Sequence, residues 1–194
     1  TISGDGVSAA QLNAIAAATT GKVTATLSSD TPLNAATVTA LKDVKTTDII
    51  SFVSDIDTLD SVEALNALLA IKKIITAADF NAVTTIEADA KDIALVKDVL
   101  KLSVNAAVTI NGEISAADAN IIAKSGIGAL TATIKAGSVA ATLKAIKDVK
   151  DGDVITFKTT DKSANATDLV ALDDLVTLNA DSVTTVTGDA KDTA

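Results

Sequence analysis

The sequence predicts an α/β repeat protein in which strands and helices alternate and the strands form a parallel sheet. Three observations lead to this prediction. The block LKDVKTTDIISF (residues 41–52) returns as IKDVKDGDVITF (residues 146–157), with seven identical positions. Short runs rich in Val, Ile and Thr recur along the chain. Segments between them repeat apolar residues every three or four positions, which favours a chain built from copies of a βα unit.

The duplication extends beyond this repeat block over most of the chain. The matching segments are 8–27 with 115–134, at an offset of 107, and 81–92 with 181–192, at an offset of 100. The offset falls in small steps, which indicates a tandem duplication with short deletions in the second copy, expected at helix ends or in loops. We therefore predict two repeat halves, residues 1–107 and residues 108–194, within one continuous solenoid.

The expected strands are eight short runs in which apolar and polar residues alternate. They are residues 1–3, 22–28, 48–54, 83–88, 106–110, 129–135, 153–159 and 182–187. In two of these runs aliphatic side chains point one way and Thr24, Thr26, Thr131 and Thr133 point the other. The alternation predicts a sheet with one buried and one open face, whereas strands of a doubly wound sheet are buried on both faces.

The segments between these strands predict helices. Their expected N-caps are Ser8, Asp60, Ser115, Ser138 and Thr167. The 19 residues between 22–28 and 48–54 are enough for a helical crossover, which makes the neighbouring strands parallel. Units of about 20 to 29 residues are typical of a leucine-rich-repeat-like βα solenoid, although its leucine consensus is absent here. The alternative is a single α/β domain with an internal duplication.

Composition excludes several classes of function. The 194 residues include 25 acidic residues against 16 Lys and no Arg, which gives a net charge of -9. An acidic surface repels nucleic acid, and without Arg the chain has no guanidinium group to bind phosphate with two hydrogen bonds, so we expect no nucleic-acid partner. No apolar run is long enough to cross a bilayer, so we expect no membrane insertion. The chain has no Cys, which leaves the compartment open.

The core is expected to consist of small and β-branched side chains, because nearly all the apolar residues are Ala, Val, Ile and Leu. Phe52 and Phe157 occupy the same position of the repeat block. A large apolar residue that returns at the end of a strand has an obvious packing role, so we interpret both as core residues.

Catalysis would have to rest on Asp, Lys, Ser and three Glu, namely Glu63, Glu87 and Glu113. The adjacent carboxylates of Asp173 and Asp174 would not face each other on a helix. The sequence has no nucleophile elbow and no phosphate loop. We therefore predict that the protein is not an enzyme and has no catalytic or cofactor-binding residues.

Three Asp-rich turns are candidate metal sites: GDG (4–6), DID (55–57) and DGD (151–153). Calcium needs six to eight oxygen ligands, and each turn supplies one or two acids. Asp and Gly are also ordinary turn residues, so we predict solvated turns, no metal site, and calcium only as an alternative. The Thr rows resemble the hydroxyl arrays of ice-binding solenoids, but other strands interrupt the series.

Residues 7–28 and 178–192 resemble the Ala/Thr/Asp-rich tandem repeats of very large secreted surface proteins of marine cyanobacteria and related bacteria. Those repeats often occur beside haemolysin-type calcium repeats, whose nonapeptide is absent here. The resemblance implies an extracellular or cell-surface location and a role in a surface layer, fibre or adhesin, with no catalytic residues.

Our first hypothesis is a structural repeat segment that assembles end to end with other copies of itself or with adjoining repeats of a longer chain. Neither residues 1–3 nor residues 182–187 contain the Lys or Pro that usually guards an edge strand, so we expect these two edges to meet. The alternative is a surface-binding module that holds glycan, mineral or ice on the open sheet face.

Overall fold

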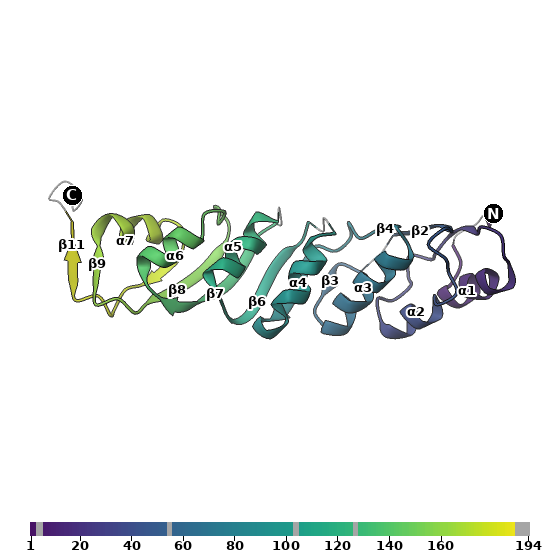
Figure 1. The fold of residues 1–194 in the computed structure, drawn as a ribbon, viewed down its shortest axis with the longest axis horizontal. Helices are drawn as coiled ribbons and strands as arrows, with labels where there is room; N and C mark the ends of the chain where they lie inside the picture. Colours follow the sequence, from purple (N-terminus) through teal and green to yellow (C-terminus); the bar gives the residue numbers. More distant parts are fainter. Residues whose placement is uncertain (3–5, 54–55, 103–104, 126–127, 189–194) are drawn as a thin grey trace. The chain divides into compact units, whose positions relative to one another are not determined.

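The computed structural model describes residues 1–2, 6–53, 56–102, 105–125 and 128–188 (Figure 1). Strands alternate with helices along the chain, and the strands pair in parallel. The expected α/β class with parallel sheets is confirmed. The chain divides into two compact units: unit 1 contains Thr1–Glu87 and Ala94–Ala106, and unit 2 contains Ala88–Ile93 and Ala107–Ala194.

Unit 1 contains two sets of parallel strands, β1-β2-β4 and β3-β5, with helices between them. Its elements are α1 (Ala9–Ala18), β1 (Thr24–Thr26), α2 (Ala35–Ala40), β2 (Ile49–Val53), β3 (Thr58–Leu59), α3 (Val62–Ile74), β4 (Ala77–Asp79), β5 (Thr85–Asp89) and α4 (Ile93–Leu100). The end of β5 and the first residue of α4 fall in unit 2.

Unit 2 has a parallel run of strands, β6-β7-β8-β10, and a second pair, β9-β11. Its elements are η1 (Ala90–Asp92), β6 (Ala107–Ile114), α5 (Ala116–Lys124), β7 (Leu130–Gly137), α6 (Val139–Ala145), β8 (Val154–Thr159), β9 (Ser163–Asn165), α7 (Ala166–Asp173), β10 (Thr177–Asn179) and β11 (Thr185–Thr187). None of the described helices is long and apolar enough to cross a membrane.

Side-chain caps start the helices close to the expected residues. Ser8 accepts a hydrogen bond from the Gln11 backbone N–H at 3.3 Å, and the Gln11 side chain accepts one from Ser8 in return, which forms a capping box. Ser115 and Ser138 are also N-caps, as expected. The other two predictions are wrong by one or two residues.

The caps of α3 and α7 are Ser61 and Asn165 in place of the expected Asp60 and Thr167. The Ser61 hydroxyl accepts from the Ala64 N–H at 3.2 Å, and the Asn165 amide oxygen accepts from the Thr167 N–H at 2.8 Å. Thr167 is therefore a donor inside the first turn of α7, because Asn165 already has the extended backbone that a cap requires.

The equivalence of the two copies extends to the strand register. The matched pairs are Thr24↔Ile49 with Thr131↔Val154, Ser51↔Ala77 with Thr156↔Thr177, and Thr58↔Thr85 with Ser163↔Thr185. Within each pair the offsets are those of the sequence repeat, 107, 105 and 100. Each strand of the first copy therefore has a partner in the second copy that pairs in the same way.

Eight strands were expected, and the described residues contain eleven. The additional strands are β3 and β4 in the first copy and β9 and β10 in the second. Each has two or three residues, too few to show an alternating pattern, so sequence periodicity missed them. In the first expected strand, the Ile2 N–H donates to the Thr24 carbonyl at 2.9 Å; Ser3 lies outside the described residues.

The shorter second copy loses residues from a helix. α3 has 13 residues and its counterpart α7 has 8, and this difference of five equals the fall in offset from 105 to 100. Strand pairs on either side of the helix keep their register. The deletion thus shortens a helix and leaves the ladder intact.

The core of each unit lies between strands and helices and contains almost only aliphatic side chains. Phe52 and Phe157 are fully or almost fully buried, which confirms them as core residues. Burial of a large apolar side chain stabilises a fold by roughly 1.5–3 kcal/mol.

Candidate functional site

The outward face of the sheet in unit 2 carries a row of polar side chains. The register places Glu113 beside Thr133, Thr133 beside Thr156 and Thr156 beside Thr177, and all four are exposed. The hydroxyl oxygens of Thr133 and Thr156 are 3.0 Å apart and share a hydrogen bond. Neighbouring strands are about 4.8 Å apart, so the row offers evenly spaced hydroxyl groups.

A shallow hollow of about 430 Å³ lies along this hydroxyl row. Lys158, Asn179 and Asp181 add an ammonium, an amide and a carboxylate to the lining, and Phe157 and Leu178 contribute apolar atoms. The Phe157 ring is almost fully buried and offers no platform for stacking. The hollow therefore combines hydrogen-bonding groups with apolar atoms.

The corresponding face of unit 1 is more apolar. There the row contains Thr26 and Ser51, and Ile49 and Val53 lie on the same outward face of β2 with about half of each residue exposed. The difference between the two faces comes from the side chains alone, because the strand register is the same in the two units. A continuous array of Thr is thus confined to the second copy.

The Asp of the repeat block is used to join strands. Asp48 accepts hydrogen bonds from the backbone N–H groups of Val23 at 3.0 Å and Lys45 at 2.9 Å. Its counterpart Asp153 accepts from Leu130 at 2.8 Å and Lys150 at 3.0 Å. These bonds connect the start of one strand to the turn before the next, so Asp153 of the predicted solvated turn has a structural partner.

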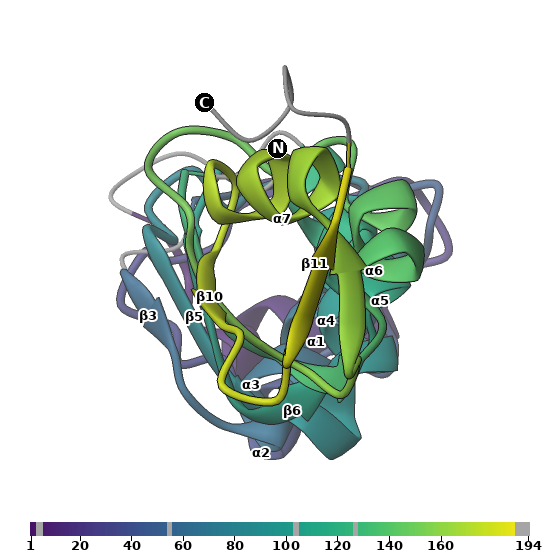
Figure 2. The ribbon, with the colours of Figure 1, turned by 90° about the vertical axis from the view of Figure 1, so that its left-hand side faces the viewer.

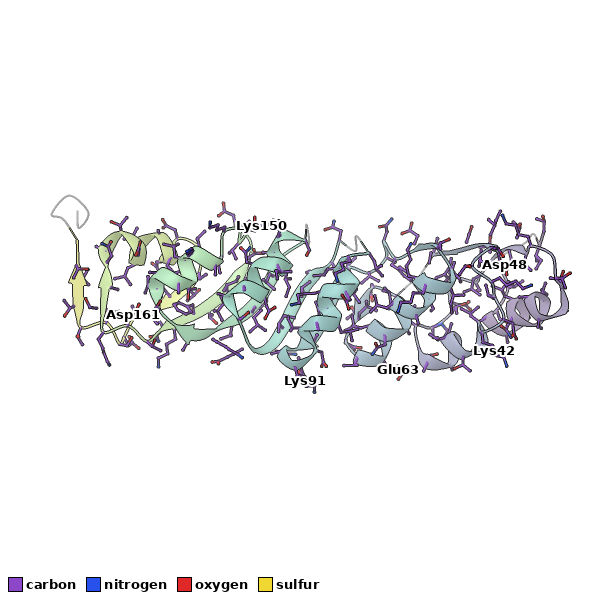
Figure 3. All side chains as sticks on the ribbon, in the orientation of Figure 1. Lys42, Asp48, Glu63, Lys91, Lys150 and Asp161 are labelled. Carbon is purple, nitrogen blue, oxygen red and sulfur yellow. The ribbon has the colours of Figure 1, made fainter. Side chains whose placement is uncertain are left out.

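The charge of Asp48, which is labelled in Figure 3, is stabilised by this arrangement. Partial burial favours the protonated form, but the two backbone donors, together with the nearby charges of Lys45 and Lys22, hold the pKa of Asp48 below its ordinary value. A carboxylate so occupied has a structural role.

A second Asp of the block makes a reciprocal bond to an Asn of the preceding helix. Asn13 donates to the Asp43 carboxylate at 2.9 Å and accepts from the Asp43 N–H at 2.7 Å. Asn120 and Asp148 repeat both bonds, at 2.8 and 2.7 Å. Both identical Asp residues of the repeat block therefore link one βα unit to the next.

Two further acids hold helix starts (Figure 3). The Glu63 carboxylate accepts from the Ala35 N–H at 3.1 Å, at the start of α2, and the Asp161 carboxylate accepts from the Val139 N–H at 2.8 Å, at the start of α6. α2 and α6 are equivalent helices, so different residues supply the same contact in the two copies.

The acids that the sequence singled out as possible catalytic groups lie on separate elements or on the end of a helix. Glu63, Glu87 and Glu113 lie on three different elements, α3, β5 and β6, and Asp173 and Asp174 lie on the exposed end of α7. Within the described ranges no three acidic residues are placed to hold a metal ion.

Two of the three Asp-rich turns, GDG (4–6) and DID (55–57), lie partly outside the described residues, because Gly4, Asp5 and Asp55 are not described. In the third turn, Gly152 adopts a φ of 97°, which a side chain would disfavour, with open space around it.

A second hollow, of about 600 Å³, lies between the turn at residues 149–155 and residues 173–177, which connect the end of α7 to the start of β10. Asp151, Asp173 and Asp174 give its rim a negative charge. It lies beside the end of the helix that is shorter than its counterpart in unit 1, so we attribute it to the deletion.

Comparison with known proteins finds no family model that matches the chain, and no curated protein or solved structure matches it either. The residues of the outward face were found in part by sequence analysis, which singled out Thr131 and Thr133. It missed Thr156 and Thr177 as members of a row, although the repeat offset contains that information once the strands are known to be parallel.

Proposed function

We propose that the chain is a structural repeat segment, a leucine-rich-repeat-like βα solenoid that extends an extracellular or cell-surface assembly such as a surface layer, fibre or adhesin. Its partners are other copies of itself or adjoining repeats of a longer chain. The observation that carries the proposal is the use of the block's two Asp residues in both copies. Asp43 and Asp48, like Asp148 and Asp153, hydrogen-bond to neighbouring βα units and so have structural roles at the block.

Repeat architectures of this kind depend on contacts between successive units, and such contacts can be extended at an end. Head-to-tail contacts do not close on themselves and generate fibres or a lattice. The exposed β11, with no Lys or Pro, supports such a contact.

The test is self-association of the chain. Sedimentation velocity and electron microscopy across a wide concentration range should reveal elongated assemblies that grow with concentration. Thr185→Pro removes a donor from the Thr185–Lys162 hydrogen bond of β11 and should abolish association while the circular dichroism spectrum is retained. A protein that stays monomeric at every concentration would contradict the proposal.

A second candidate is a surface-binding module that uses the hydroxyl row of unit 2 to hold glycan, mineral or ice. The observation that favours it is the aligned row Thr133, Thr156 and Thr177 beside a hollow of about 430 Å³. Thr133→Val with Thr156→Val should abolish adsorption to the surface concerned, and Thr26→Val in unit 1 is the matched control. Equal adsorption by all three proteins would rule this candidate out.

A further inference from the structure

Equivalent positions at the end of the second copy are much more exposed than in the first copy. Ile86 is 0% exposed, and its counterpart Val186 is 57% exposed. The same holds for three other pairs. They are Ala78 with Leu178, Phe80 with Ala180, and Val83 with Val183; the first member of each is buried and the second is partly exposed.

This contrast does not come from a different backbone. Val186 pairs with Ala164, and Ile86 pairs with Leu59. Ala164 and Leu59 are both buried, and side chains of paired residues lie on the same face of a ladder. Val186 therefore points to the interior side of its strand, as Ile86 does.

Backbone hydrogen bonds support the same equivalence. The N–H groups of Thr84 and Thr85 donate to the Asp57 carbonyl at 2.7 and 3.0 Å. Those of Thr184 and Thr185 donate to the Lys162 carbonyl at 2.9 and 3.1 Å. In Figure 2, α7, β10 and β11 surround the interior of this part of unit 2. The face formed by Leu178, Val183 and Val186, here called the end face, thus consists of interior residues that stay exposed.

In unit 1, the chain that follows β5 supplies an amphipathic helix. α4 is the next helix after α3 in Figure 1, and most of it belongs to the same compact unit as β5. Val96, Val99 and Leu100 on α4 are almost completely buried, whereas Asp98 on the helix and Lys101, the residue that follows the helix, form an exposed ion pair at 2.6 Å. In the first copy, β5 is thus followed in sequence by a helix that has a buried Val/Leu stripe on one side and charged residues on the other.

We propose that the end face of unit 2 is a docking surface for a helical segment of this chemistry: a short turn with Lys and Asp, a helix of about two turns with a Val/Leu stripe, and an extended segment after it. The inference rests on the proposed function, because it names the kind of unit that the array receives at this end. Among the 194 residues, the segment with this pattern at this place in the repeat is 89–106.

A second copy of the chain is a different occupant. Residues 1–7 correspond to β6, the strand that comes after α4, and carry only Ile2 and Val7 as large apolar residues. This segment brings no helical Val/Leu stripe for Val183 and Val186. Direct addition of a second copy is therefore one outcome of the test.

The test uses the whole chain and a synthetic peptide of residues 88–110, ADAKDIALVKDVLKLSVNAAVTI, with a fluorescent label. Fluorescence anisotropy should show saturable binding, and Val186→Lys should weaken it at least tenfold. Val154→Lys is the matched control, because Val154 is 58% exposed but its counterpart Ile49 is exposed too, at 49%. A peptide with Val96→Asp and Val99→Asp should not bind.

A fusion checks the same inference without a free peptide. The segment 93–106 added after Asp192 should raise the melting temperature and reduce binding of a hydrophobic dye, and the doubly substituted segment should do neither. Absence of peptide binding together with an unchanged melting temperature overturns the inference, as does equal weakening by Val186→Lys and Val154→Lys.

The outcomes separate this inference from the proposed function. If the peptide binds but the chain stays monomeric at every concentration, the end face is a docking surface and the proposed assembly is wrong. If the chain assembles, Val186→Lys prevents assembly and the peptide does not compete, a second copy docks directly and the helical occupant is wrong.

Discussion

The region around α3 in unit 1 and the region around α7 in unit 2 have equivalent strand pairing, but different side chains fill their interiors. α3 has 13 residues and buries Leu65, Leu68 and Ile71. Phe80 follows it and packs edge-on against Phe52, with ring centroids 6.0 Å apart. α7 has 8 residues, and Ala180 stands where the first copy has Phe80.

A side chain of α3 strengthens the contrast. The Lys72 ammonium donates to the Ala78 carbonyl at 2.6 Å and lies 6.0 Å from the centroid of the Phe80 ring. The long helix, its Lys and the extra Phe therefore form one group in unit 1. The comparison teaches that pairing defines the repeat, while helix length and side-chain size vary together to fill the space behind it.

The largest expected effect is on the two equivalent Phe residues. Phe52→Ala and Phe157→Ala should each lower the free energy of unfolding by about 3 to 5 kcal/mol, because each leaves a cavity. Phe52→Ala should cost about 0.5–1.5 kcal/mol more, since it also loses the ring contact with Phe80. Urea denaturation of both single variants and the double variant measures this. The effects should nearly add, and strong coupling would mean that the two sites contact each other.

A second prediction concerns the first half alone. The fragment 1–107 should remain folded, although less stable, because each βα unit contacts mainly its neighbours. Circular dichroism and thermal unfolding provide the measurement. A fragment that is fully unfolded at low temperature would indicate a single core shared by both copies.

Loss of the hydrogen bonds that Asp48 or Asp153 accepts should lower the free energy of unfolding by a smaller amount. Asp48→Ala leaves the N–H groups of Val23 and Lys45 without their acceptor, which should cost about 1–3 kcal/mol, and Asp153→Ala should do the same to Leu130 and Lys150. Chemical denaturation of the two variants should give similar losses. The exposed Asp173→Ala is the control and should change stability by about 0.5 kcal/mol or less.

The hydrogen bonds that Asp48 accepts also predict that stability depends on pH. The pKa of Asp48 is lower in the folded chain than its ordinary value of 3.8, so folding favours the ionised form. Its contribution to stability is complete above the unfolded pKa and is lost as the pH falls below 3.8 through the folded pKa. Stability of the wild-type chain should therefore fall more steeply with acid than that of Asp48→Asn, measured by denaturation between pH 6 and pH 2. Parallel curves would contradict this assignment.

The smallest effect is expected on the exposed ion pair of α4. The Lys101 ammonium donates to the Asp98 carboxylate and lowers the pKa of Asp98. Lys101→Ala should raise that pKa, as measured by NMR titration, and should leave the unfolding midpoint nearly unchanged at high salt. A large change in the midpoint would mean that α4 depends on this pair.

The sequence by itself determined the α/β class, the parallel pairing and the duplication, because the period of apolar residues and the repeated block are local patterns. It also identified Phe52 and Phe157 as core residues and Ser8, Ser115 and Ser138 as caps. These features depend on residues three or four positions away or on a direct repeat, and both patterns can be recognised in the sequence.

Tertiary structure alone decided which short segments become strands and which polar residues hold the units together. β3, β4, β9 and β10 are too short for a local signal; β3, β4 and β10 pair with the longer strands β5, β2 and β8, and β9 pairs with β11, which has the same length. The sequence predicts that Asp153 is a solvated turn residue, but the fold brings the N–H groups of Leu130, remote in sequence, and of Lys150, near in sequence, to its carboxylate. The exposed end face also could not be predicted from the sequence. The exposure of a residue depends on which other residues pack against it across the interior, and sequence order does not give those contacts.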